Sequence, residues 1–242
     1  MSRQEPSAEP GGEALPAPAV SAVSHCLRSL RSVRRFLAAD VDQRSIEFVL
    51  EHATRAGSAK NRQPWRFVVV RDAGVLAELT VWYRRSLRKL AALDAARPEL
   101  FPADDRRRAQ VRESELLARS LDAVPVVVVA CFLPIPANPA NFYGGASIYP
   151  AVQNLLVAAR AIGLGGALTT LQAVDELPEA ACLSAGNGVA DELRTLLGIP
   201  AEVVPAAVVP LGWPAQPLTV NRRDPVREVA YADRWERPWT PA

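Results

Sequence analysis

Two short polar segments hold the side chains that could bind a phosphorylated, planar ligand. The first reads RSVRRF and begins with Arg31 and Ser32, followed after one residue by Arg34. Guanidinium forks with a hydroxyl donor suit a phosphate dianion near neutral pH. Arg222 and Arg223, near the other end of the chain, could bind the same phosphate. Because nearly all the cations of this chain are arginines, solvated arginine clusters remain an open alternative.

The second segment, residues 58–67, reads SAKNRQPWRF and leads into an apolar stretch. Asn61 and Gln63 stand just before a rigid Pro-Trp pair, and each carboxamide offers both a donor and an acceptor. Such groups suit the edge of a uracil-like ring or a ribityl chain. An ordinary loop with a structural tryptophan is the alternative. Thr169 and Thr170 end a predicted strand and could line a ring, or could simply be strand residues.

A glycine run, Gly163, Gly165 and Gly166, follows a predicted helix and precedes a predicted strand. A Rossmann fingerprint needs the opposite order, so that the helix N-terminus faces the pyrophosphate. The run therefore indicates a helix stop and close packing into the strand, and not a dinucleotide-binding loop.

Composition excludes several classes of protein. The chain has 242 residues, a net charge of +2 and 49% hydrophobic residues, which is typical of one globular domain that binds no nucleic acid. Three distant cysteines without a CxxC pair, and only two histidines, argue against a metal site, a disulfide framework and a Ser-His-Asp triad. A reducing cytoplasm fits this cysteine usage. No apolar run reaches the ~20 residues of a membrane helix, so we expect no membrane partner.

Hydrophobic periodicity predicts helices and strands in alternation, and therefore a mixed sheet covered by helices. We expect a disordered tail over residues 1–20 and one domain over residues 21–242. Within it, residues 84–122 are the most charged and least patterned, which predicts a variable helical excursion or lid. The expected helices are 20–30, a helix after the N-cap Asp42, 73–93, 148–162 and 191–197; the expected strands are 67–71, 124–132, 167–171 and 203–213.

Over residues 23–235 this sequence resembles the FMN-dependent nitroreductase family, and the matching segments occur in the order that the family uses. The matching segments are residues 31–36, 58–67, 150–165, 192–200, 211–214 and 222–235. The resemblance implies an α+β fold with a central, largely antiparallel sheet flanked by helices. It also implies an intertwined homodimer with two active sites at the subunit interface.

The resemblance also implies roles for individual residues in binding FMN. Arg31, Ser32, Arg222 and Arg223 match positions that hold the phosphate and ribityl chain, and Arg34 matches a basic residue beside the pyrimidine edge. Ser58 and Asn61 match positions that reach the flavin or the substrate from the partner subunit, and we place Gln63 with them. Leu168, Thr169 and Thr170 match the strand end whose backbone lies along the isoalloxazine ring. No catalytic side chain is expected, since the chemistry is centred on the flavin.

The function implied is an FMN-dependent oxidoreductase. It would take hydride from NAD(P)H and pass it to a small-molecule acceptor, such as a nitroaromatic or quinone, in alternating half-reactions. One alternative keeps the family and changes the chemistry, to that of a dehydrogenase or reductive dehalogenase. Another is a flavin-binding protein without turnover.

Overall fold

A computed structural model describes residues 14–96, 105–134, 142–176, 188–220 and 223–239. The chain divides into two compact units. The larger unit comprises residues 31–217, and the terminal unit combines residues 1–30 with residues 218–242.

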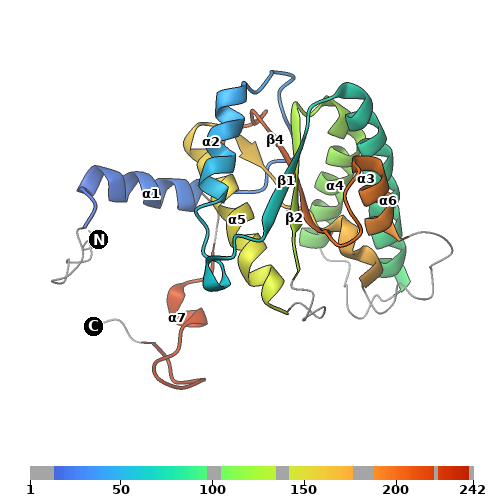
Figure 1. Ribbon diagram of the computed structural model, residues 1–242. Helices are drawn as coiled ribbons and strands as arrows, with labels where there is room; N and C mark the ends of the chain where they lie inside the picture. The colour runs from blue at the N-terminus through green and yellow to red at the C-terminus, as the bar shows by residue number, and fades with distance from the viewer. Residues whose placement is uncertain (1–13, 97–104, 135–141, 177–187, 221–222, 240–242) are drawn as a thin grey trace. The chain divides into compact units, whose positions relative to one another are not determined.

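The larger unit is built on a four-stranded sheet in the order β1-β2-β4-β3 (Figure 1). The strands are β1 (Trp65–Val70), β2 (Val126–Phe132), β3 (Gly165–Gly166) and β4 (Val204–Gly212). Every pair of neighbouring strands is antiparallel, which confirms the predicted fold class. The central pair contains a bulge between Ala130 and Cys131, opposite Pro205. A proline, which has no N–H to donate, is tolerated at such an irregularity.

Helices cover both faces of this sheet. In Figure 1, α2 (Gln43–Ala53) and α5 (Phe142–Ala161) lie on one face and contact each other. On the other face lie α3 (Ala73–Ala96), α4 (Asp105–Ser120) and α6 (Val189–Leu197). The described residues also form 3-10 segments at η1 (Ala59–Asn61), η2 (Leu121–Ala123) and η3 (Leu171–Glu176).

Local sequence explains the best-defined of these elements. Asp42 caps α2 by accepting a hydrogen bond from the Ser45 N–H at 2.9 Å, as its position predicted. Every residue of β2 is buried, as expected for a short β-branched run. Val127, Val129 and Cys131 of β2 join the core beneath α3, α4 and α6. By strand alternation, the residues between them face α5.

Residues 84–122 are not simply a surface excursion. Leu93 on α3, Leu117 on α4 and Leu121 on η2 are all buried in the main core. The sequence prediction missed this because their apolar positions are diluted by many arginines and glutamates. Residues 97–104, where the chain passes from α3 to α4, lie outside the described residues.

The terminal unit contains α1 (Ala17–Ser29) and the short α7 (Val226–Val229). Residues 1–13 of the expected disordered tail lie outside the described residues, but α1 begins within the last part of that tail. Tyr231 and Pro238 form an isolated antiparallel bridge in this unit. No helix in the described part of the chain combines the length and apolarity needed to cross a membrane.

Candidate active site

The arginine-bearing segment that begins at Arg31 lies along the open edge of β3. The Val33 N–H donates to the Gly166 carbonyl at 2.9 Å. Farther along, the Leu37 N–H donates to the Trp213 carbonyl at 2.9 Å, and Phe36 forms an antiparallel bridge with Pro214. The main chain of this segment is therefore fixed by the sheet.

The glycine run makes this close approach possible. Gly163 ends α5 at φ +88°, a conformation that favours glycine. A Cβ at Gly165 would lie only 2.5 Å from Val33 Cγ2, and a Cβ at Gly166 only 2.8 Å from the Pro210 carbonyl oxygen. The prediction of a helix stop followed by close packing is confirmed, and the segment packed there is the one that carries Arg34.

The chain continues past β3 as a strand end whose hydrogen bonds alternate. The Ala167 N–H donates to the Pro210 carbonyl at 3.4 Å. Thr169 and Val208 exchange both of their main-chain hydrogen bonds, at 3.1 and 2.9 Å. In an antiparallel ladder the intervening residues direct their N–H groups to the other side. Leu168 and Thr170 therefore present their amides on the edge where Val33 is bound.

Two of the predicted sets of site residues thus meet at one edge of one sheet. Arg31 and Ser32 are exposed there, Arg34 is half-buried, and Thr170 is exposed. Among the residues that the structure describes, no carboxylate forms an ion pair with Arg34. The predicted strand 167–171 is wrong in position: regular pairing is confined to Gly165–Gly166, and within 167–171 only Thr169 forms an isolated bridge, with Val208.

Tyr83 on α3 is a member of this site that the sequence did not reveal. Its side chain is 2% exposed, and its hydroxyl forms a hydrogen bond with Thr169. Burial raises the pKa of Tyr83, while that hydrogen bond and the positive charge of Arg34 partly oppose the rise. The phenol is therefore neutral at physiological pH. A tyrosine on an apolar helix face reads in sequence as ordinary core.

The loop before β1 is held in an unusual backbone conformation. Lys60, Asn61 and Gln63 have φ angles of 54°, 52° and 51°, in the left-handed region that few non-glycine residues adopt. The Gln63 N–H donates to Ser58 Oγ at 3.0 Å, and the Gln63 side-chain amide donates to Asn61 Oδ1 at 3.3 Å. Such backbone strain persists where the surroundings enforce it, and it is often found at functional sites.

This loop enters the sheet at the edge opposite to β3. The strand order puts β1 and β3 at the two ends of the sheet, which are about 14 Å apart for three strand spacings. One chain therefore does not bring Ser58, Asn61 and Gln63 to Arg34 and Thr170. That these loop residues act from a partner subunit stays a prediction.

The second arginine cluster belongs to the terminal unit. Arg222 lies outside the described residues, and Arg223 is exposed. The convergence of Arg31 and Arg223 on one phosphate stays a prediction.

The sequence model of the nitroreductase family matches residues 27–213, which is most of the chain. This chain belongs to the nitroreductase family. Its sequence is 28% identical over 214 residues to a provisionally named NADH dehydrogenase/NAD(P)H nitroreductase of Methanothermobacter thermautotrophicus, covering 88% of this chain and 87% of the relative.

Solved structures show the same fold at lower sequence identity. Iodotyrosine deiodinase bound to FMN and 3-iodo-L-tyrosine is 20% identical with a TM-score of 0.63, covering 88% of this chain and 98% of the deiodinase. The NADPH:FMN oxidoreductase of Vibrio harveyi, complexed with NAD+, is 17% identical with a TM-score of 0.61, covering 89% of this chain and 78% of the oxidoreductase.

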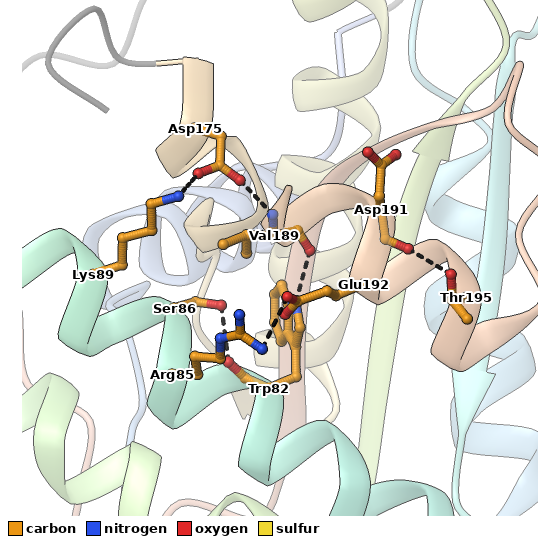
Figure 2. A network of polar contacts seen from close by, with 9 residues as sticks. All are labelled: Trp82, Arg85, Ser86, Lys89, Asp175, Val189, Asp191, Glu192 and Thr195. Carbon is orange, nitrogen blue, oxygen red and sulfur yellow. Dashed lines mark hydrogen bonds and ion pairs between the residues drawn. The ribbon is translucent and has the colours of Figure 1, made fainter. Parts of the chain in front are cut away.

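In this nitroreductase-family chain, a polar network holds the turn that follows the strand end (Figure 2). Asp175 on η3 pairs with the Lys89 ammonium and accepts a hydrogen bond from the Val189 N–H at the start of α6. The Trp82 indole N–H donates to the Val189 carbonyl at 2.8 Å. The network thus joins η3, α3 and α6.

Proposed function

We propose that this protein is an FMN-dependent oxidoreductase that takes hydride from NAD(P)H and passes it to a nitroaromatic, quinone or similar acceptor in alternating half-reactions. Membership of the nitroreductase family supports the proposal. So do the names of its relatives and structural neighbours, which refer to NAD(P)H and to FMN. FMN, when bound, supplies the centre that accepts hydride and gives it up.

The observation that carries the proposal is the shared edge of Val33 and the strand end. Gly165 and Gly166 let the Val33 segment pack closely against that edge, and the amides of Leu168 and Thr170 point outward along it. A planar ring with acceptor atoms on its rim fits such a row of donors. A phosphate at the far end of the ligand fits the exposed guanidinium of Arg31 and hydroxyl of Ser32. The described residues therefore suit FMN.

Each residue has a distinct part in the proposed reaction. Arg34, half-buried and close to Tyr83, would stabilise negative charge that develops on the pyrimidine side of the ring. Tyr83 and Thr169 would keep the strand end in a fixed position. The Thr170 N–H would donate to the reactive ring nitrogen. No side-chain nucleophile takes part in this scheme.

A homodimer completes the site in this proposal. On α1, Val20, Val23 and Leu27 recur at i, i+3 and i+7, and each is exposed. In the C-terminal segment Trp235 is 78% exposed. Exposed apolar side chains that recur on one helix face indicate a surface that a partner covers. We propose that a second copy covers them and supplies Ser58 and Asn61 to the flavin.

Purification and anaerobic reduction test this function. The protein should be yellow and should release FMN on denaturation; a colourless protein that cannot be reconstituted with FMN would overturn the proposal. Anaerobic mixing with NADH and with NADPH should bleach the flavin, and re-oxidation by a panel of nitroaromatic, quinone and halogenated acceptors identifies the acceptor class. Bound FMN that neither nicotinamide reduces would instead identify a flavin-binding protein without turnover.

A further inference from the structure

Three carbonyl groups of β4 point towards the strand end, and each receives a hydrogen bond. The Pro210 carbonyl accepts from the Ala167 N–H and the Val208 carbonyl from the Thr169 N–H. The third, that of Ala206, accepts from the side-chain Nε2 of Gln172 at 2.7 Å. The spacing of two residues is that of one antiparallel ladder. A side chain therefore replaces the main-chain donor at the last position.

The path of the chain explains this replacement. After Thr170 the main chain turns into η3, where the Ala173 N–H donates to the Thr170 carbonyl at 3.0 Å. It can then no longer follow β4, so the next β4 carbonyl needs another donor. Gln172, two residues beyond Thr170, is long enough to provide one.

Gln172 is also buried at a cost. Its side chain is 2% exposed, and its Oε1 has no hydrogen-bond partner in the described part of the chain. A buried acceptor without a partner is unfavourable. A methionine of similar length would avoid that penalty but could not donate to the Ala206 carbonyl, so the amide is accounted for by its donor.

We propose that Gln172 is a positioning residue that ends the β4 ladder and thereby fixes the main chain of Thr169 and Thr170 at the flavin. This inference rests on the proposed function, because it assigns Gln172 to the same FMN site. Asp175 anchors the far end of η3 through Lys89 and Val189. Gln172 is the anchor that lies next to the amide expected to contact the ring.

The test compares Q172M with wild type in the full-length, FMN-loaded protein. Q172M keeps the length of the side chain and removes the donor. We expect native folding, amide exchange at Thr169 faster by about tenfold, and a shifted visible spectrum and midpoint potential of bound FMN. The rate of flavin reduction should fall about tenfold, with the KM for NAD(P)H nearly unchanged.

Two further variants separate positioning from packing. Y149F is the matched control, because the Tyr149 hydroxyl also donates to the Ala206 carbonyl, at 3.4 Å, but from α5. Y149F should leave amide exchange, the FMN spectrum and the reduction rate at wild-type values. Q172E should resemble wild type more closely at low pH, where the introduced carboxyl is protonated and can donate, than at high pH.

Each outcome has a defined consequence. If the Thr169 amide of Q172M exchanged at the wild-type rate, Gln172 would not fix the strand end, and the proposal would be refuted. Faster exchange with an unchanged FMN spectrum and reduction rate would reduce Gln172 to a structural residue, as would equal effects in Y149F. If the wild-type chain binds no FMN, the proposed function itself fails, and exchange in the apoprotein alone decides whether Gln172 fixes the strand end.

Discussion

Replacing Gly165 with alanine should displace the segment that carries Arg34, chiefly through contact with Val33. The new Cβ would lie 2.5 Å from Val33 Cγ2 and 3.1 Å from Pro214 Cγ. Since carbon atoms pack at about 3.5–4.0 Å, Val33 must move away by about 1 Å. Val33 is buried and β-branched, so it cannot escape by changing rotamer. Overpacking of this kind costs about 1–3 kcal/mol of unfolding free energy.

The displacement should also reach the site. The Val33 N–H is bonded to the Gly166 carbonyl, and Arg34 follows directly, so a shift of Val33 moves both. We expect G165A to lower the midpoint of urea unfolding and to raise the Kd for FMN about tenfold, which corresponds to about 1.4 kcal/mol of binding free energy. Urea titration followed by circular dichroism and fluorescence titration with FMN measure the two quantities.

Two comparisons make the argument refutable. A Cβ at Gly57 would meet no atom within 4 Å, so G57A should leave FMN affinity unchanged. V33A creates room for the new methyl group, and the double variant G165A/V33A should therefore be more stable than the sum of the single changes predicts, by about 0.5–3 kcal/mol. Strict additivity, or wild-type FMN affinity in G165A, would show that this contact does not position the segment.

Two other predictions concern Arg34 and Cys131. R34A should slow NAD(P)H-driven flavin reduction, measured by stopped flow, more than it weakens FMN binding; an equal loss of both would remove its electrostatic role. Burial raises the pKa of Cys131 from its ordinary value near 9 to about 11. The folded state therefore holds a proton that the unfolded state has lost between these values, so unfolding free energy should fall as pH rises through this range. C131A should flatten that part of the pH profile in urea titrations, and an identical slope would contradict the assignment.

Much of the local structure could be predicted from the sequence, because its causes are local. Asp42 caps α2 because a carboxylate placed three residues before an N–H can accept from it. The run from Val126 to Phe132 forms a buried strand because β-branched residues suit a pleated, desolvated surface. The order of Gly163, Gly165 and Gly166 after a helix was enough to exclude a Rossmann loop and to predict close packing.

Contacts between distant segments required the tertiary structure. In the sequence Tyr83 looks like a core residue and Gln172 like a turn residue, because no neighbouring residue indicates which group the phenol or the amide contacts. Their roles come from the strand order, which brings Thr169 beside Val208 and puts β1 at the opposite edge from β3. Residue types therefore determined which chemistry this chain could carry. Sheet topology decided which of those residues meet, since the pairing register between remote strands is set by global packing and not by local preference.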